Sequence, residues 1–386
     1  MQSAQGRNEE HSGPQLKIVI IQGAFLPVPP VMGGACEKMW HALAQKFAAR
    51  GHTVLHISRK WPTFPDREEI QGVHHLRVTG YSTPSKLLTL KILDAIYTVR
   101  TIRAIPMDAD IVVTNTFWAP VIIPLFRRAK VYVDVARMPK GQMKFYRNAA
   151  RLRANSTPVA NAILAELPEV RHSRVAMIPN PLPDEATKPV NWAIKECSIL
   201  YCGRVHPEKG LELLAMLAKV LPAGWKISIV GPWKTAEGGG GDAYLSSLKT
   251  LFEPNRVDFI GPIYEMEKLN LWYEKAAIFV YPSVAEKGET FGLAPLEAMA
   301  WGGVPVVSDL QCFKDFIVDG VNGRIFNHRV TDAQTQLMDC ALSLINNGEL
   351  RRTLGTSASK VRQTHSPISV ADLFLADFAR LTENAV

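Results

Sequence analysis

Short apolar runs alternate with segments of helical period from residue 16 onward. "LKIVII" (16–21) predicts a strand, and a loop rich in Pro and Gly follows it. Met39, Leu43 and Phe47 then recur at every fourth position, which predicts a helix ending at Gly51. "TVLHI" (53–57) has the pattern of a second strand. The order strand, loop, helix, strand is typical of a parallel, doubly wound sheet.

The same order starts again after the proline-rich segment 177–192. "CSILYCG" and "KISIVG" predict strands on either side of a helix with Leu214, Leu217 and Leu221 at helical spacing. Further strands are expected in "VDFIG", "AIFVYPS" and "VPVVSD". The pattern predicts an α/β chain of two Rossmann-like domains facing each other across a cleft at the carboxyl ends of their strands. The expected divisions are a disordered lead-in (1–15), an N-terminal Rossmann-like domain (16–185), a C-terminal Rossmann-like domain (186–365) and a C-terminal helix (366–386).

Composition agrees with two globular domains. The chain has 386 residues, 47% of them hydrophobic, and its five scattered cysteines form no CxxC pair, as expected of buried thiols in a reducing compartment. The first fifteen residues are polar and do not resemble a signal peptide, and the most apolar long run (109–126) is interrupted by Asp110 and two prolines. We therefore expect a soluble, cytoplasmic protein.

The net charge of +8 and the pI near 9.2 indicate an anionic partner. Nucleic acid, an anionic membrane surface and an anionic small ligand all remain open on charge alone. The sequence contains no GxxxxGK[ST], no GxGxxG opening either half, no HExxH and no Cys/His cluster with zinc spacing. These absences argue against a P-loop phosphotransferase, a nicotinamide enzyme and a zinc enzyme, and neither a cofactor nor a metal is expected.

Two glutamates, Glu289 and Glu297, lie in the segment "ETFGLAPLEAMAWGG" with seven residues between them. Pro295 suits the first turn of a helix, so Glu289 is expected on the preceding loop and Glu297 in the early turns. The N–H groups of Gly292 and Leu293 would lie at the helix N-terminus, which favours a phosphate. Each carboxylate can accept two hydrogen bonds and suits a vicinal diol. Carboxylates on both sides of a phosphate site match the order ribose, diphosphate, hexose of a nucleotide sugar.

The segment "CGRVHPEKG" follows the first strand of the second half and places Arg204 and Lys209 at the carboxyl end of that strand. Two cations at this position can neutralise a diphosphate, Arg as a fork and Lys as a point charge, which accounts for the absence of a DxD-type metal pair. Further on, "EGGGGD" (237–242) is expected to be a flexible loop rather than a phosphate cradle.

With these segments and the early "PPVMGG", the sequence resembles the retaining glycosyltransferase family 4, of GT-B fold, over nearly the whole chain from residue 16. The resemblance implies a hexosyltransferase that uses a nucleotide sugar, UDP-sugar first and GDP-sugar next, without a metal. The implied acceptor is a glycan, such as a polysaccharide or lipopolysaccharide, a lipid-linked sugar or a secondary metabolite.

The resemblance also assigns roles to domains and residues. It implies that the N-terminal domain (16–185) takes the acceptor, that the C-terminal domain (186–365) takes the nucleotide-sugar donor, and that the C-terminal helix (366–386) packs back on the N-terminal domain. It implies that Glu297 holds the ribose and Glu289 the distal hydroxyls of the sugar, with Arg204 and Lys209 on the diphosphate, and it makes Glu289, Arg204 and Lys209 the catalytic set. The remaining donor-binding residues that it implies are Gly292, Leu293, Phe291, Gly33, Gly34, Ile263 and Tyr264, the last two at the base.

The sequence departs from the family in one respect. Many members carry a histidine near the anomeric centre after a middle strand of the first half, whereas this chain has "VYVDVARMPKG" there. Asp134 or Arg137 occupies that neighbourhood on the acceptor side, and both stay open.

The segment "SKLLTLKILDAIYTVRTIRAI" (85–105) predicts a helix with Leu90, Leu93 and Tyr97 near one side and basic residues distributed around it. A basic amphipathic face resting on an anionic membrane and a core helix with solvated basic residues are both open interpretations. The alternatives for the whole chain are a nucleotide-sugar epimerase or hydrolase of the same fold, and a basic nucleic-acid-binding protein. The last lacks any stacking-aromatic or recognition-helix motif, so no nucleic-acid partner is expected.

Overall fold

The computed structural model describes residues 14–169, 172–183 and 188–383, and most of the expected lead-in (1–15) lies outside them. The chain divides into two compact units. Unit 1 comprises residues 1–154, 159–178 and 367–386, and unit 2 comprises residues 155–158 and 179–366. Each unit contains its own sheet and its own apolar core. The division falls at residue 178, whereas the sequence analysis placed it near residue 185.

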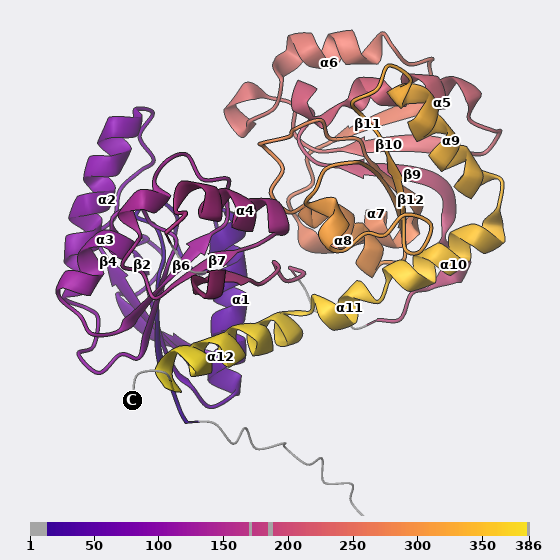
Figure 1. Ribbon diagram of the computed structural model, residues 1–386. Helices are drawn as coiled ribbons and strands as arrows, with labels where there is room; N and C mark the ends of the chain where they lie inside the picture. The colour runs from indigo at the N-terminus through magenta and orange to yellow at the C-terminus, as the bar shows by residue number, and fades with distance from the viewer. Residues whose placement is uncertain (1–13, 170–171, 184–187, 384–386) are drawn as a thin grey trace, which may run out of the picture. The chain divides into compact units, whose positions relative to one another are not determined.

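Unit 1 is built on an eight-stranded sheet of order β3-β4-β2-β1-β5-β6-β7-β8 (Figure 1). Its strands are β1 (Lys17–Ile21), β2 (Thr53–Arg59), β3 (Arg67–Ile70), β4 (Val73–Val78), β5 (Ile111–Thr114), β6 (Lys130–Val135), β7 (Arg151–Ala154) and β8 (Val175–Met177). All neighbours are parallel except β3, which pairs antiparallel with β4 at the edge. The helices around this sheet are α1 (Ala35–Ala49), α2 (Leu87–Ile102), α3 (Ala119–Ile122), α4 (Thr157–Glu166) and α12 (Pro367–Glu383). The sheet is therefore the doubly wound type that the sequence pattern predicts.

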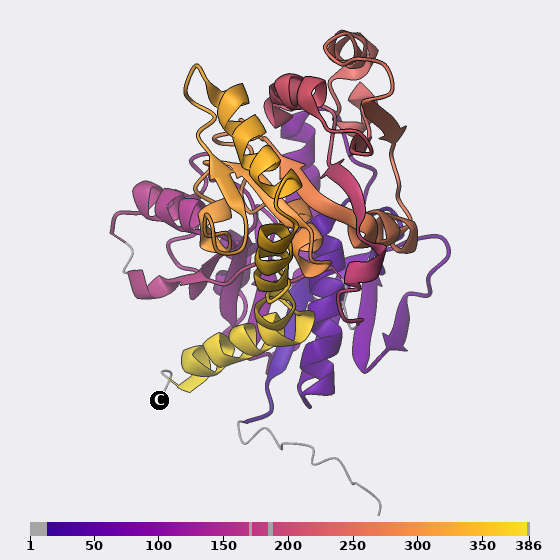
Figure 2. The ribbon, with the colours of Figure 1, turned by 90° about the vertical axis from the view of Figure 1, so that its right-hand side faces the viewer.

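Helices α1 and α12 lie side by side on one face of the unit 1 sheet (Figures 1 and 2). The expected apolar positions of α1 are buried, and Trp40 adds a ring whose centroid lies 5.0 Å from that of Phe374 on α12. The Tyr132 hydroxyl on β6 donates a hydrogen bond to Asp377 (2.9 Å), which fixes α12 to the sheet. Leu373 faces solvent, because Val370, Phe374 and Phe378 already fill the positions against the sheet.

Unit 2 is built on a six-stranded parallel sheet of order β11-β10-β9-β12-β13-β14. Its strands are β9 (Glu196–Cys202), β10 (Lys226–Val230), β11 (Val257–Gly261), β12 (Ala276–Tyr281), β13 (Val304–Ser308) and β14 (Arg324–Phe326). The helices are α5 (Ala215–Val220), α6 (Gly241–Lys249), α7 (Met266–Lys275), α8 (Leu293–Ala300), α9 (Ala333–Ile345), α10 (Gly348–Ala358) and α11 (Val361–Thr364). Strands β9, β12 and β13 are neighbours, so the loops that follow them meet at one edge of the sheet.

The central strands β12 and β13 of unit 2 are buried on both faces, as expected for a parallel sheet covered by helices. All six residues of β12 and all five of β13 are buried. None of the helices within the described residues is both long enough and apolar enough to cross a bilayer.

Candidate donor site in unit 2

Lys209 and Glu289 form a buried ion pair at the carboxyl edge of the unit 2 sheet. Lys209 ends the 3₁₀ helix η5 (Pro207–Lys209) after β9, and Glu289 lies on the loop after β12. The Lys209 Nζ donates to the Glu289 carboxylate at 2.6 Å, and the exposed fractions of the two side chains are 7% and 12%. Nζ also lies 5.2 Å from the ring centroid of Tyr281. Burial, followed by the charge of Glu289, raises the pKa of Tyr281 and keeps its hydroxyl protonated. The structure thus brings together two predicted site residues that are 80 positions apart.

Arg204 lies at the same edge but has protein partners. Its guanidinium donates to Glu208 at 2.5 Å and to the Gly238 carbonyl at 2.6 Å, and its side chain stays 43% exposed. Glu208 therefore holds a predicted phosphate ligand in place while leaving part of it accessible.

The glycine-rich segment 237–241 is packed against this loop. The Gly240 N–H donates to the Val205 carbonyl at 2.9 Å, and Gly239 is so close to the Trp233 backbone that a Cβ there would lie 2.2 Å from it. The sequence predicted a flexible loop here, whereas in the structure the small residues of this segment pack closely beside Arg204.

Helix α8 begins at Leu293 with Gly292 as its N-cap, so Glu289 lies on the preceding loop and Glu297 within the helix, as the sequence predicts. Gly292 is the N-cap residue with φ 91°, a conformation that favours glycine, and a Cβ there would lie 2.5 Å from the Phe313 ring. Gly292 offers no capping side chain, so the N–H groups at Leu293 and beyond, with the helix dipole, favour an anion. Phe291 is 3% exposed, and its ring lies 5.4 Å from that of Phe316, which makes it a packing residue that positions the helix start.

Glu297 lies in the second turn of α8 and is half-buried. It accepts a hydrogen bond from the Tyr273 hydroxyl of α7 at 2.7 Å. Burial, then the neighbouring Cys202 and Glu297, raises the pKa of Tyr273 well above its usual range, so this hydroxyl remains a donor. Glu297 and Glu289 are thus held by different partners, Tyr273 for one and Lys209 for the other.

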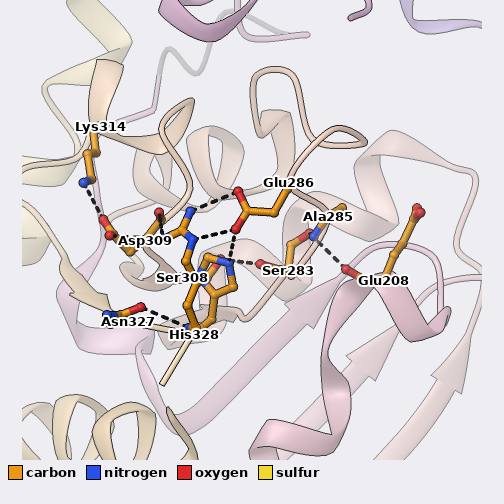
Figure 3. A network of polar contacts seen from close by, with 10 residues as sticks. Glu208, Ser283, Ala285, Glu286, Ser308, Asp309, Lys314, Asn327 and His328 are labelled. Atoms are coloured by element: carbon orange, nitrogen blue, oxygen red, sulfur yellow. Dashed lines mark hydrogen bonds and ion pairs between the residues drawn. The ribbon is translucent and has the colours of Figure 1, made fainter. Parts of the chain in front are cut away.

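A pocket of about 230 Å³ lies beside Glu289. It is lined by Pro158, Glu286, Glu289, Asp309, Leu310, Gln311, Cys312, Lys314 and Arg329. Figure 3 shows the polar network on its wall: Glu286 pairs with Arg329 (2.7 Å) and His328 (2.9 Å), and Asp309 pairs with Lys314 (2.5 Å). The hydrogen bond from Arg329 is the main cause that lowers the pKa of Glu286. Charged groups that hold each other in fixed positions thus surround the space next to Glu289.

The two residues expected at the base lie beyond β11. Ile263 is partly buried and lines a separate pocket of about 620 Å³ under α7. Tyr264 is 72% exposed, and its hydroxyl donates to Glu237. Tyr264 and Arg204 therefore both bond to the loop at residues 237–238.

In unit 1, Gly33 and Gly34 precede α1 with φ values of 80° and 92°. The φ of Gly34 lies in the region that favours glycine, and a Cβ there would also require the Glu37 carboxylate, 2.1 Å away, to move. Asp134 is buried on β6: one oxygen accepts from the Trp40 indole (2.8 Å) and the other from Arg153 (2.7 Å). Arg137 is exposed. Burial raises the pKa of Glu37, and the positive charge of Arg137 partly offsets this rise.

Polar side chains cross the carboxyl edge of the unit 1 sheet on the face that α1 covers. By register they follow one another from β4 to β7 as Arg77, Ser58, Gln22, Asn115, Asp134 and Arg153. Both polar atoms of the Gln22 amide are buried, and neither has a partner among the described residues. This edge is therefore polar but closed by the packing of α1.

Three histidines lie next to this row. His56 and His75 face each other on β2 and β4 with ring centroids 5.4 Å apart, and His41 of α1 lies 5.7 Å from His75. Burial, then the neighbouring His41 and Arg77, lowers the pKa of His75 to about 4, and burial places the pKa of His56 well below its usual value. The rings are neutral near pH 7. In the described residues, no group of three or more His, Cys, Asp or Glu is arranged to hold a metal ion.

Several residues at the unit 2 edge were not predicted. Glu208, Tyr273 and Tyr281 hold Arg204, Glu297 and Lys209, and Glu286 and Arg329 form the pocket wall. Glu208 carried one signal, since it follows Arg204 by four positions. The others come together only through the strand order and carry no mark in the local sequence.

The fold is that of the GT-B glycosyltransferases, with an α/β chain in two parallel-sheet units. Sucrose-phosphate synthase (tll1590) from Thermosynechococcus elongatus is similar with a TM-score of 0.76 and 19% identity, over 96% of this chain and 100% of that chain. Anabaena Alr3699/HepE in complex with UDP is similar with a TM-score of 0.71 and 16% identity, over 94% of this chain and 99% of that chain. At such identities the likeness concerns the fold alone.

Residues 184–361, nearly all of unit 2, match the family described as Glycosyl transferases group 1. The lipopolysaccharide core biosynthesis mannosyltransferase LpcC of Rhizobium leguminosarum bv. viciae is 26% identical over 183 residues, 45% of this chain and 50% of the relative. Sulfoquinovosyl transferase SQD2 of Arabidopsis thaliana is 30% identical over 164 residues, 42% of this chain and 29% of the relative. The matches thus span half or less of these curated relatives, and the family match covers the unit that holds the Lys209–Glu289 pair.

Proposed function

We propose that this protein is a glycosyltransferase that moves a hexose from a nucleotide sugar to an acceptor hydroxyl, with retention of configuration and without a metal. The observation that carries the proposal is the buried Lys209–Glu289 pair next to the N-terminus of α8, with Glu297 held by Tyr273. The positive charge and the N–H donors suit a diphosphate, and the two carboxylates suit the diols of the ribose and of the sugar on either side of it.

In the proposed complex, Glu297 accepts hydrogen bonds from the ribose, and the N–H groups at Gly292 and Leu293 hold a phosphate. Lys209 and the exposed part of Arg204 face the diphosphate, and Glu289 takes hydroxyls of the sugar in the adjoining pocket. Ile263 and Tyr264 remain the candidates for the base, and Gly33 and Gly34 for closure over the donor. Arg137 is the better acceptor-side candidate, because both oxygens of Asp134 are already bonded.

The reaction begins when the bond between the anomeric carbon and the diphosphate oxygen lengthens. Negative charge grows on the leaving diphosphate, where Lys209, Arg204 and the start of α8 are already oriented to stabilise it. The acceptor oxygen forms its bond to the anomeric carbon on the same face, and its proton passes to the departing phosphate oxygen. The protein thus acts by fixed charge and positioning.

The donor is proposed as a UDP-sugar, with a GDP-sugar next, and the acceptor as a glycan, a lipid-linked sugar or a secondary metabolite. The names of two relatives support transfer of this kind: a mannosyltransferase of lipopolysaccharide core biosynthesis and a sulfoquinovosyl transferase. A cytoplasmic location and contact with an anionic membrane remain predictions, and the surface that bears on the second is argued below.

Calorimetric titration with UDP, GDP, ADP and TDP tests the donor site. One nucleotide is expected to bind wild-type protein. Its affinity falls roughly 10- to 100-fold in Glu297→Gln and about tenfold in Tyr273→Phe, because each change removes a hydrogen bond to a charged group. Glu267→Gln, an exposed glutamate on α7, serves as the matched control and keeps wild-type affinity.

Two results would contradict the proposal. Binding of no nucleotide by the wild type removes the donor site. Consumption of the nucleotide sugar with release of free sugar, and no acceptor product, favours a hydrolase of the same fold.

A further inference from the structure

Helix α2 presents an apolar line to solvent. Leu88, Ile92, Ile96 and Val99 are 72%, 52%, 42% and 51% exposed, and their spacing of four, four and three places them on one side of the helix. The residues buried on the opposite side are Asp94, Tyr97, Thr98, Thr101 and Ile102. The helix thus packs against unit 1 through a mixed face and turns an apolar face outward. Figure 1 shows α2 at the outside of unit 1.

This outward face differs from the one that the sequence pattern suggests. Leu90 and Leu93 are only partly buried and Tyr97 is fully buried, so they belong to the packed side or its margin. An exposed row of aliphatic side chains over three turns is uncommon on a monomeric protein and marks an interaction surface.

The charges around α2 have one sign. Between Ser82 and Met107 the sequence has four basic residues, Lys86, Lys91, Arg100 and Arg103, and one acidic residue, Asp94. Asp94 is buried and accepts hydrogen bonds from the N–H groups of Phe117 and Trp118. No carboxylate of this segment therefore offsets the positive charge at the surface.

Neighbouring loops continue the same apolar and basic character beside the helix and at its C-terminal end. Near its middle, the Lys91 ammonium lies 4.5 Å from the Phe117 ring centroid, and Phe117 lies 6.2 Å from Phe145, which is 51% exposed. At its end, Arg127 donates to the Ile102 carbonyl at 2.6 Å.

The residues just before Arg127, Leu125 and Phe126, are 73% and 58% exposed. We call the exposed face of α2 together with Phe145, Leu125 and Phe126 the α2 surface.

We propose that the α2 surface docks on an anionic lipid bilayer, with the helix axis in the plane of the membrane. The aliphatic and aromatic side chains enter the boundary between headgroups and acyl chains, and the flanking Lys and Arg side chains reach the anionic headgroups. A second copy of this chain fits less well, because two such surfaces would bring like charges together. The proposal goes beyond the transfer reaction, and it places an acceptor embedded in a lipid surface within reach of unit 1.

Co-sedimentation of the full chain with lipid vesicles tests the proposal without any substrate. Vesicles of phosphatidylcholine alone are compared with vesicles containing roughly 30 mol% phosphatidylglycerol. The wild type is expected to bind the anionic vesicles at least tenfold more strongly, and added salt weakens the binding.

Two variants separate the apolar and the charged parts of the α2 surface. Leu88→Gln/Ile92→Gln lowers binding at least tenfold, because two large apolar side chains no longer enter the interface. Lys86→Gln/Arg103→Gln lowers binding to anionic vesicles roughly 25-fold, about fivefold per charge, and leaves neutral vesicles unaffected. Val318→Gln/Val321→Gln is the matched control, with both valines 55% exposed in unit 2, and binds like the wild type.

Equal binding to neutral and anionic vesicles, no binding to either, or wild-type binding by Leu88→Gln/Ile92→Gln would overturn the proposal. Light scattering of the same samples identifies the competing occupant: a dimer that dissociates in Leu88→Gln/Ile92→Gln, with no vesicle binding, assigns the surface to a second copy. Nucleotide affinity, measured separately by calorimetry, stays unchanged in all these variants. A failed donor site and a failed membrane surface are therefore distinguishable.

Discussion

The carboxyl edges of the two sheets carry polar side chains in opposite situations. In unit 2 the charges form pairs, such as Lys209–Glu289 and Arg204–Glu208, around a pocket and a helix N-terminus. In unit 1 the equivalent edge is closed by α1: Asp134 is bonded to Trp40 and Arg153, and the neighbouring histidines are neutral.

The comparison shows how burial decides what a charged side chain at the carboxyl edge of a sheet can do. A charge that keeps one side toward solvent, as Arg204 does with 43% of its side chain exposed, retains its charge and can exchange a protein partner for a ligand. A fully buried charge must keep its partner, because an isolated buried ion is very costly. The ligand-binding charges are therefore expected in unit 2, and Asp134 is expected to act as a structural residue.

The largest expected effect concerns Lys209. Lys209→Ala lowers turnover of the nucleotide sugar roughly 100- to 1,000-fold, because loss of one oriented donor to a developing negative charge typically raises the barrier by about 3 to 4 kcal/mol. Steady-state kinetics with the donor found by calorimetry measures the change. Lys195→Ala is the control, since the Lys195 Nζ bonds the Tyr273 and Ala276 carbonyls, near the opposite end of β12. Near-normal turnover by Lys209→Ala would remove Lys209 from the catalytic set.

A double-mutant cycle sharpens this result. Lys209→Ala and Glu289→Gln act on one pair, so their combined effect on turnover is expected to fall well short of the product of the single effects. Independent effects would mean that the two side chains work at separate places.

The next effect concerns unit 1. Asp134→Asn is expected to lower the free energy of unfolding by about 3 kcal/mol, because it leaves the fully buried Arg153 guanidinium without its countercharge. Urea unfolding measures the loss, and Asp258→Asn, an exposed partner of Lys226, changes stability by less than about 1 kcal/mol. If Asp134→Asn keeps wild-type stability but loses transfer, Asp134 acts on the acceptor and the contrast between the units fails.

The smallest effect concerns pH. The pKa of His75 in the folded state, about 4, lies below its unfolded value near 6.5, and the pKa values of His56 and His41 are also lowered by burial. The unfolded chain therefore binds more protons between pH 6.5 and 4. The stability that His75 contributes is fully present above pH 6.5 and falls by at most about 1.4 kcal/mol per pH unit as the pH decreases toward 4, and the lowered pKa values of His56 and His41 act in the same direction.

Unfolding by urea at several pH values measures this slope. His75→Phe is expected to flatten it, whereas His74→Gln, which changes an exposed histidine on the same strand, leaves it unchanged. A wild-type slope of zero in this window would mean that the three rings are protonated in the folded protein.

The fold could be predicted from local patterns in the sequence, whereas the site could be predicted only in part. Periodicity placed both sheets, and glycine and proline placed Gly292 and Glu297 at the start of α8. Pairing across the sheet was not predictable, because Lys209 meets Glu289 only through the adjacency of β9 and β12. The burial of Asp134 and the outward apolar side of α2 were missed for the same reason, since both depend on which surface a neighbouring element covers.

The position of α12 in the chain has a consequence for synthesis. Unit 1 receives Val370, Phe374 and Phe378 in its core from a segment made after all of unit 2. Asp377 is made 245 residues after its partner Tyr132, a delay of roughly 12 to 50 s on the ribosome at ordinary elongation rates. During that interval the rings of Trp40 and Tyr132 lack their cover, while the main stretch of unit 2 is already complete. The first unit to leave the ribosome is thus the last to finish folding.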